Sequence, residues 1–433
     1  MNEKQWLRRV FVPLKLVEEV TPANALRRTH LPATLICVPA LTFLDARASV
    51  LREVRSARGI PGTETVSIEA SAGRVLAEDI AADRDYPPFN RSVRDGFAVR
   101  SSDMPGRVRI IGEVRAGERF EGVVQPGEAV EIMTGAPLPE GADAVVMVEH
   151  CTRHEDGSVA TDRSAEAGSN IAPIACEARA GTTVLPRGTR IDYPSVAWLA
   201  TTGHSKVAVF ARPRVAILAT GDEIVAIAET PAAHQIRNSN SYSLAAQVRR
   251  AGGDAIILPV ARDEKQATAL LIAQGLTADL LLLSGGVSAG KYDFVESALA
   301  DCGAEFHFDR VLIQPGQPLV FGRARGKFFF GLPGNPASSM VTFELFGRAA
   351  LDLLSGANEA PLPLTLARLT RPFRHRPGLT RFLPAQVSCA EVTPVDWQGS
   401  GDVPSLCRAN AFLVADPNQD EYAAGDPIPV LLK

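Results

Sequence analysis

Three acidic residues of this chain stand where an apolar or glycine-rich run gives way to a turn. Glu223 closes ATGDE, Asp263 follows AIILPVAR, and Asp293 ends SGGVSAGKYD. Carboxylates gathered in one crevice repel one another unless a cation lies among them, and Mg²⁺ is a hard ion that bridges carboxylates and phosphate oxygens. We therefore predict a Mg²⁺ site on Glu223, Asp263 and Asp293. Each has a structural alternative as a turn residue or, for Asp293, a helix N-cap.

Two glycine-containing turns accompany these carboxylates in the sequence. Ser284-Gly285-Gly286 follows four leucines, and Gly334-Asn335-Pro336 follows FFFGLP. Glycine lets backbone N–H groups approach a phosphate, and a helix that begins after the turn adds favourable partial charge. Neither turn belongs to a GxxxxGK[ST] or GxGxxG motif. We predict that both turns bind a phosphate-bearing ligand, while each alone also suits a plain strand-to-helix connection.

The elements that must position these residues form an alternating pattern. From Arg214 onward, the runs RVAILATGDE, AIILPVARDE, DLLLLSGG and KFFFGLPGNP alternate with helical stretches such as 241–253. Buried strands that alternate with helices indicate a parallel sheet, whose strands end on one edge, where ligands bind. We therefore expect an α/β domain at 209–356 that gathers the carboxylates and both turns at one edge.

The remaining sequence predicts β-rich domains around that α/β domain. Residues 83–163 contain short strand-like runs separated by Gly, Pro and Asp turns, and 357–433 contain Pro-rich and strand-like segments. We expect a small β-domain and a C-terminal β-domain in these two regions. The stretches 39–82 and 164–208 are expected to form one discontinuous linker or dimerisation domain, in which the first helix covers 41–54.

The N-terminal residues 1–38 are expected to be a disordered extension. The apolar stretch at 31–44 is too short to span a bilayer and is interrupted by Pro32 and Pro39. The positive and apolar regions are also too far apart for a typical signal peptide. The sequence therefore predicts a protein that does not cross a membrane.

The composition is that of a folded globular protein, with 46% hydrophobic and 22% charged residues. A formal net charge of −4 and the absence of long Lys/Arg runs argue against nucleic-acid binding. Six scattered cysteines without a CxxC pair suit the reduced thiols of the cytoplasm. Cys151 lies between His150 and His154, but no second ligand group follows, which favours a solvated loop over a zinc site.

Two further motifs lie in the β-rich region. Residues 87–100 read PPFNRSVRDGFAVR, and 131–149 read EIMTGAPLPEGADAVVMVE. Together with ATGDE, SGGVSAGKYD and GLPGNPASS, in this order, they resemble the molybdopterin molybdotransferase family, which includes the MoeA proteins and the gephyrin E domain. The resemblance extends from about Leu41 to at least Leu354.

This resemblance implies a multidomain protein of α/β plus β class, in which a parallel-sheet, molybdopterin-binding α/β domain is flanked by β-rich domains. It further implies an elongated, L-shaped subunit in a homodimer. The implied reaction inserts molybdate into adenylyl-molybdopterin with a divalent ion, here Mg²⁺, and releases AMP. A molybdopterin adenylyltransferase or a molybdoenzyme is a possible protein partner. No nucleic acid or membrane is implied, and the expected location is the cytoplasm.

Carried over position by position, the resemblance implies five active-site residues: Asp95, Thr134, Glu223, Asp263 and Asp293. The carboxylates would bind the metal ion and polarise the phosphate bond. Backbone donors near Ser284 to Gly286 and near Gly334 to Asn335 would hold pterin and phosphate. The site is expected to combine the α/β domain of one subunit with the β-domain of the other.

The chain departs from the family pattern most clearly at Gln314-Pro315-Gly316-Gln317-Pro318, where KPGKP is usual. Amides hydrogen-bond an anion but do not neutralise it. We still predict that Gln314 and Gln317 bind the cofactor, with Lys291, Arg310 and Arg323 as candidate compensating cations. Asn90 replaces the usual Asp, and 172–177 differ as well.

These departures leave an alternative, a catalytically weak carrier or scaffold that binds molybdopterin. A third option is a molybdopterin adenylylating enzyme, because related α/β domains share the SGG and PGNP turns. The long β-rich section before the α/β domain argues against that option.

Overall fold

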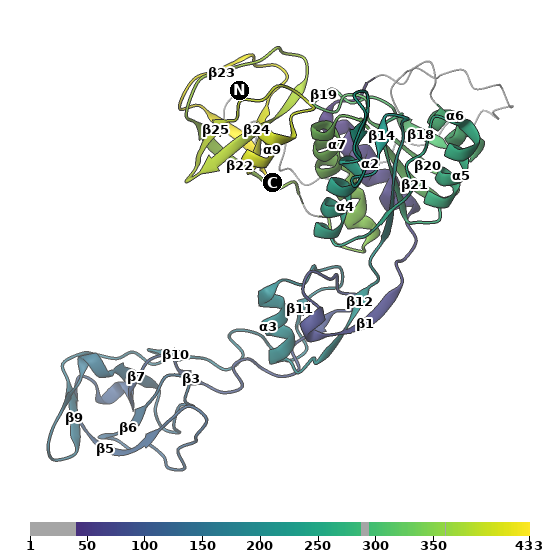
Figure 1. The fold of residues 1–433 in the computed structure, drawn as a ribbon. Helices are drawn as coiled ribbons and strands as arrows, with labels where there is room; N and C mark the ends of the chain where they lie inside the picture. Colours follow the sequence, from purple (N-terminus) through teal and green to yellow (C-terminus); the bar gives the residue numbers. More distant parts are fainter. Residues whose placement is uncertain (1–39, 287–293, 360) are drawn as a thin grey trace, which may run out of the picture. The chain divides into compact units, whose positions relative to one another are not determined.

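The computed structural model describes residues 40–286, 294–359 and 361–433. The chain forms two compact units (Figure 1). One combines the N-terminal part up to Glu64 with Phe210–Lys433, and the other comprises Thr65–Val209. Within these described ranges, no helix is both long enough and apolar enough to cross a bilayer.

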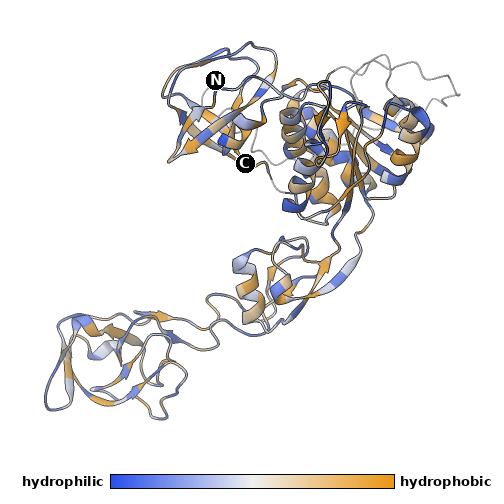
Figure 2. Cartoon of the chain, viewed as in Figure 1, coloured by the Kyte–Doolittle hydropathy of each residue, from blue (hydrophilic) through white to orange (hydrophobic). Residues whose placement is uncertain are grey.

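A six-stranded sheet forms the centre of the first unit, in the order β16-β13-β17-β21-β20-β18. The first four strands are parallel, whereas β20 and β18 run antiparallel to their neighbours. Leu280 to Leu283 in β17 are fully buried because both faces of the sheet are covered, and Figure 2 shows the apolar character of these strands. In chain order the strands are β13 (Arg214–Ala219), β16 (Asp254–Ile257), β17 (Leu280–Ser284), β18 (Glu305–Phe308), β20 (Val320–Ala324) and β21 (Lys327–Leu332).

Helices cover both faces of this sheet (Figure 1). One face packs against α5 (Lys265–Gly275) and α6 (Phe294–Asp301). The other face packs against α2 (Phe43–Ala57), α4 (Asn240–Arg250), α7 (Pro336–Thr342), the π-helical turn η4 (Phe343–Gly347) and α8 (Arg348–Leu354). The predicted alternation of buried strands and helices is therefore present, and the predicted α/β plus β class is confirmed.

Helix α2 lies in a different place from the one expected from its position in the chain. We grouped it with 164–208, but its apolar stripe packs into the core of the α/β sheet. Thr42 caps the helix by accepting a hydrogen bond from the Asp45 N–H (3.2 Å). The Phe43 ring meets Phe346 and Phe382 edge-on, with ring centroids 5.9 and 5.2 Å apart. An amphipathic pattern predicts that a helix is buried but does not identify the core that buries it.

The C-terminal part of the first unit is a second six-stranded sheet, in the order β19-β24-β25-β22-β28-β26. An additional β24–β26 pairing closes this sheet on itself around an apolar core. The elements are β19 (Ile313–Gln314), β22 (Leu364–Leu369), β24 (Thr380–Ser388), β25 (Glu391–Pro394), β26 (Ala411–Ala415) and β28 (Pro427–Leu432), with β23 (Phe373–Arg374), β27 (Glu421–Tyr422) and α9 (Val403–Arg408) beside them. Strand β19 therefore connects the two parts of this unit.

The second unit contains a six-stranded sheet in the order β7-β4-β6-β5-β9-β8, with an apolar cluster on each side. Its strands are β4 (Gly96–Val99), β5 (Gly106–Val114), β6 (Glu128–Ile132), β7 (Ala144–Met147), β8 (Thr152–Arg153) and β9 (Ser158–Thr161). A separate small core lies among β1 (Thr63–Ser67), β2 (Ile80–Ala81), β11 (Thr183–Leu185), α3 (Tyr193–Thr201) and β12 (Lys206–Phe210). Strands β3 (Arg91–Ser92) and β10 (Ile171–Ala172) pair with each other.

Candidate active site at the carboxyl edge of the sheet

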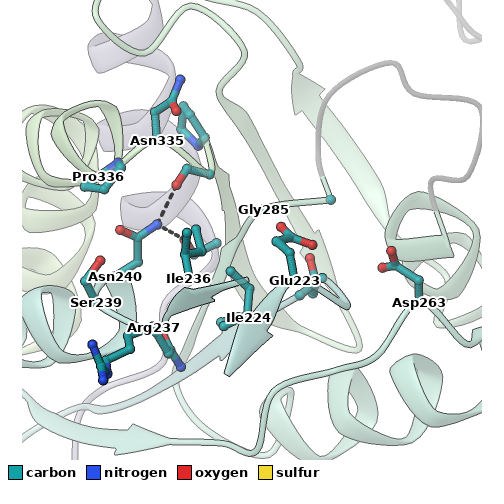
Figure 3. Close-up of a pocket in the computed structure, with 18 of the residues that line it drawn as sticks. Glu223, Ile224, Ile236, Arg237, Ser239, Asn240, Asp263, Gly285, Asn335 and Pro336 are labelled. Atoms are coloured by element: carbon teal, nitrogen blue, oxygen red, sulfur yellow. Dashed lines mark hydrogen bonds between the residues drawn. The ribbon is translucent and has the colours of Figure 1, made fainter. Parts of the chain in front are cut away.

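A cavity of about 580 Å³ lies at the edge where β13, β17 and β21 end (Figure 3). Eight residues predicted from the sequence line this cavity: Glu223, Asp263, Ser284, Gly285, Gly286, Gly334, Asn335 and Pro336. They come together because parallel strands present their carboxyl ends on the same edge. Asp293 lies outside the described residues, and so does Lys291.

The SGG turn requires glycine for steric reasons. Gly285 and Gly286 adopt φ values of +91° and +64°, in the left-handed region. A Cβ atom on Gly286 would lie 2.6 Å from the Thr220 hydroxyl oxygen, and one on Gly285 would lie 2.9 Å from the Thr220 carbonyl oxygen. Both glycines therefore allow the turn to lie close against the end of β13.

The acidic side of the cavity concentrates negative charge. The Asp263 N–H donates to the Asp222 carboxylate (3.1 Å). Partial burial, followed by the nearby carboxylates of Asp222 and Glu223, raises the pKa of Asp263 above its usual value. A bound cation would relieve the repulsion among these carboxylates. Glu223 and Asp263 therefore supply part of the oxygen ligands that a hard divalent ion prefers. Nevertheless, the described residues contain no group of three or more such side chains in metal-binding arrangement.

One side of the cavity was not predicted from the sequence. Ile224 in β14 (Ile224–Val225) and Ile236 and Arg237 in β15 (Ile236–Arg237) line it. Ile236 keeps 59% of its surface exposed, so it offers an apolar face to a ligand. Asn240 at the start of α4 also lines the cavity. No short-range sequence pattern marks these residues, because Ile and Asn are ordinary at strands and helix starts.

Gln314 and Gln317, which we predicted to bind the cofactor, are not among the residues that line this cavity. Pro318, in the same turn, does line it. Gln314 is exposed on β19, and its peptide bond to Pro315 is cis. The Gln317 carbonyl oxygen accepts from the Val311 N–H (3.0 Å). The turn packs closely on α7, since a Cβ atom on Gly316 would lie 2.4 Å from Thr342 Cγ2.

Of the cations proposed to compensate, Arg323 pairs with Glu305 across the β18–β20 ladder (3.4 Å). Another cation lies closer in the fold, because Arg381 of β24 is the register partner of Gln314. Gln314 and Arg381 are far apart in the sequence, so the sequence alone did not predict this pairing.

The second unit brings Asp95 and Thr134 together. One Asp95 carboxylate oxygen accepts from both the Thr134 N–H (2.7 Å) and the Thr134 hydroxyl (2.8 Å). These bonds, the backbone one first, lower the pKa of Asp95. Both residues are exposed. Gly96, which follows Asp95, allows β4 to lie close to the backbone of β7, since a Cβ atom on Gly96 would lie 2.0 Å from the Val146 carbonyl oxygen.

Two departures from the family pattern occupy one contact region. The Asn90 side-chain oxygen accepts from the Ile174 N–H (2.8 Å), and Arg91 pairs with Glu177 (2.6 Å). Both contacts connect the PPFN motif to the altered 172–177 segment. These replacements are therefore accommodated together by the local structure.

Among the described residues, His150, Cys151 and His154 do not come together as a group of three side chains that could hold a metal ion. Cys151 packs against the apolar cluster of Phe97 and Val159, and burial raises its pKa to about 11. A thiol with a raised pKa is a poor ligand and nucleophile. Its role is to fill the core of the β-domain.

Comparison with known families divides the chain into three matched regions. Residues 41–203 match the MoeA N-terminal region (domain I and II), 216–353 match a probable molybdopterin binding domain, and 366–433 match the MoeA C-terminal region (domain IV). The C-terminal match adds a specific assignment where the sequence had shown only length and strand character.

Curated relatives agree with these matches. A molybdopterin molybdenumtransferase of Bacillus subtilis is 36% identical over 386 residues, which is 86% of this chain and 90% of the relative. One of Staphylococcus aureus strain Mu50 is 32% identical and covers 90% of this chain and 95% of its own length.

Two solved structures of molybdopterin biosynthesis MoeA proteins from Pyrococcus horikoshii are similar as well. They have TM-scores of 0.74 and 0.67 at 28% and 32% identity, and each comparison covers 91% of this chain and 100% or 99% of the solved one. The chain therefore belongs to the MoeA family of molybdopterin molybdenumtransferases.

Proposed function

We propose that this protein inserts molybdate into adenylyl-molybdopterin and releases AMP, producing molybdenum cofactor. The observation that carries the proposal is the cavity at the carboxyl edge, where two strand-to-helix turns face two carboxylates. Family membership supports the reaction class, because the curated relatives are named molybdopterin molybdenumtransferases.

The cavity divides into parts suited to different parts of the substrate. The backbone N–H groups of Gly286, Gly334 and Asn335, which line the cavity, are suited to phosphate oxygens. The exposed faces of Ile224 and Ile236 are suited to a planar ring. Glu223 and Asp263, together with Asp293, would hold Mg²⁺, which when bound neutralises phosphate charge.

We further propose that the active enzyme is a cytoplasmic homodimer. Asp95 and Thr134 form a preorganised acceptor and hydroxyl pair, but they belong to the second unit. The five cysteines that the structure describes are all free thiols, which suits a reducing compartment. A molybdopterin adenylyltransferase, which makes the substrate, and molybdoenzymes, which receive the product, are the proposed protein partners.

The test is conversion of adenylyl-molybdopterin by the purified protein with molybdate and Mg²⁺, followed by AMP release. We expect turnover that requires both ions and that falls at least about a hundredfold in Glu223→Gln, because the proposed Mg²⁺ loses an anionic ligand. Glu229→Gln, in the loop after β14, is a matched control that should retain activity. Tight binding of molybdopterin without AMP release would instead support the carrier or scaffold alternative, which Gln314 and Gln317 favour.

A further inference from the structure

The Asn240 side chain joins two turns of the cavity. Its Nδ2 donates to the Ser284 hydroxyl oxygen (2.8 Å) and to the Gly334 carbonyl oxygen (2.7 Å), as Figure 3 shows. Ser284 ends β17, Gly334 follows β21, and Asn240 begins α4. One amide therefore connects three segments that are far apart in sequence.

The chemistry of these partners fixes the orientation of the amide. A carbonyl oxygen only accepts hydrogen bonds, so the NH₂ group of Asn240 must face Gly334. An amide NH₂ has two hydrogens, and the two contacts use both of them. Ser284 is therefore an acceptor towards Asn240, and its own proton must be donated elsewhere.

The Ser284 proton has no good acceptor in the described structure. Ser339 Oγ is 3.5 Å away, at the limit of a hydrogen bond, and its own hydrogen goes to the Pro333 carbonyl oxygen (3.0 Å). Ser284 also lines the cavity. Its hydroxyl is therefore available to donate to an oxygen of a bound molecule.

Among the described residues, the Asn240 side chain makes no other hydrogen bond, and its Oδ1 is buried without a partner. At the start of α4, the side-chain oxygen of Asn238, one residue before the N-cap Ser239, accepts from the Ser241 N–H (3.1 Å). Gln247 links α4 to α7 and η4, since its Nε2 donates to the Met340 carbonyl oxygen (3.0 Å) and to the Glu344 carboxylate (2.8 Å). Helix start and helix packing are thus provided by neighbours.

We propose that Asn240 is a positioning residue, which fixes the Ser284 hydroxyl as a donor to an oxygen of the substrate and holds the SGG and GNP turns together. This inference rests on the proposed function of the cavity. The oxygen belongs either to a phosphate or to the pterin carbonyl, since both accept a hydroxyl proton.

The test is a double-mutant cycle of Asn240→Ala and Ser284→Ala, with Gln247→Ala as a matched control on the same helix. We expect each cavity variant to raise KM for adenylyl-molybdopterin about tenfold, the usual effect of one hydrogen bond, with a smaller change in kcat. The double variant should be close to either single variant, because Asn240 acts through Ser284. Gln247→Ala should lower the melting temperature but leave KM unchanged.

Dissociation constants for AMP and for molybdopterin, measured by calorimetry, distinguish the two candidate oxygens without turnover. Weaker binding of AMP or of inorganic phosphate assigns a phosphate oxygen. Because molybdopterin also carries a phosphate, weaker molybdopterin binding assigns the pterin end only where binding of AMP and of inorganic phosphate is unchanged. An unchanged KM in Asn240→Ala, or effects that multiply in the double variant, would overturn the positioning role. If the parent protein binds both ligands but releases no AMP, the proposed function is wrong. The dissociation constants of the single and double variants would then still test the positioning role of Asn240.

Discussion

Gln314 of the short strand β19 and Arg381 of the longer strand β24 are neighbours, and this pairing places a cation beside the Gln314–Pro318 turn. They are register partners in the parallel β19–β24 pair, so their side chains lie on the same face. Arg381 forms no carboxylate pair within the described part of the chain, and its Nε is buried without a partner. Burial and the nearby Arg376 lower the pKa of Arg381. One cation is therefore already present beside the turn that lacks its lysines.

Adding the two lysines should tighten anion binding. We expect Gln314→Lys with Gln317→Lys to lower the dissociation constant for molybdate or AMP about tenfold, with a steeper salt dependence, because the two added positive charges attract an anion bound in the cavity that Pro318 of the same turn lines. Calorimetry over a range of salt concentrations measures both effects. Gln386→Lys adds a charge to the exposed far end of β24 and serves as the control. Unchanged or weaker binding would mean that Arg381 already fills the role or that this turn does not face the ligand.

The Asp156 carboxylate makes the folding stability of the β-domain depend on pH. It accepts from the Ser158 hydroxyl (2.6 Å) and N–H (3.1 Å) and pairs with Arg107. These contacts, the hydroxyl first, lower the pKa of Asp156 well below its ordinary value. The folded-state pKa is depressed, so the stabilisation is complete above about pH 4 and is lost as the pH falls towards the folded value.

Urea unfolding of the parent and of Asp156→Asn should therefore differ at pH 7 and converge as the pH falls below about 4. The amide keeps the size and an acceptor oxygen, so only the charge is removed. A difference that stays constant across this pH range would show that the carboxylate charge contributes nothing to folding.

At the scale of elements, local patterns predicted the strands well and their partners less well. The four leucines of β17 are apolar at every position, which only a strand covered on both faces requires. Helix α2 was predicted from its apolar periodicity, but its packing against Phe346 and Phe382 depends on residues about three hundred positions later. The same limit concealed Asn240 and Arg381, whose contacts are long-range. Sequence spacing reports the period of an element and not the identity of its neighbour.

The burial of α2 in the first unit can be tested by truncating its anchor. Phe43 is 7% exposed and contacts two buried rings, so Phe43→Ala should destabilise the fold by about 3–5 kcal/mol. Denaturant unfolding at constant m-value measures this loss. Leu44 is 44% exposed, and Leu44→Ala should cost little. Equal effects of the two substitutions would contradict this placement of α2.

At the scale of the whole molecule, the predicted active-site residues are divided between two separately packed units. Glu223 and Asp263 belong to the unit containing the α/β sheet, whereas Asp95 and Thr134 belong to Thr65–Val209. Each unit has its own apolar cores, so each positions its residues independently. A reaction that needs both sets must bring two such units together, and our dimer proposal supplies them from different subunits.

This proposal predicts complementation between two inactive variants. In a dimer that combines the α/β unit of one chain with the second unit of the other, a hybrid of Asp95→Ala and Asp263→Ala has one intact site and one doubly damaged site. Equal mixing with free exchange makes about half of the dimers hybrid, so about a quarter of the parent AMP-release rate should return. Sites built within one chain would give no recovery, since every chain carries one defect.

The reciprocal mixture separates the models again: the parent mixed with the Asp95→Ala/Asp263→Ala double variant should retain about a quarter of the activity for shared sites and about half for sites within one chain. Mass analysis of differently tagged subunits verifies exchange, and absence of recovery in exchanged dimers would refute the shared site.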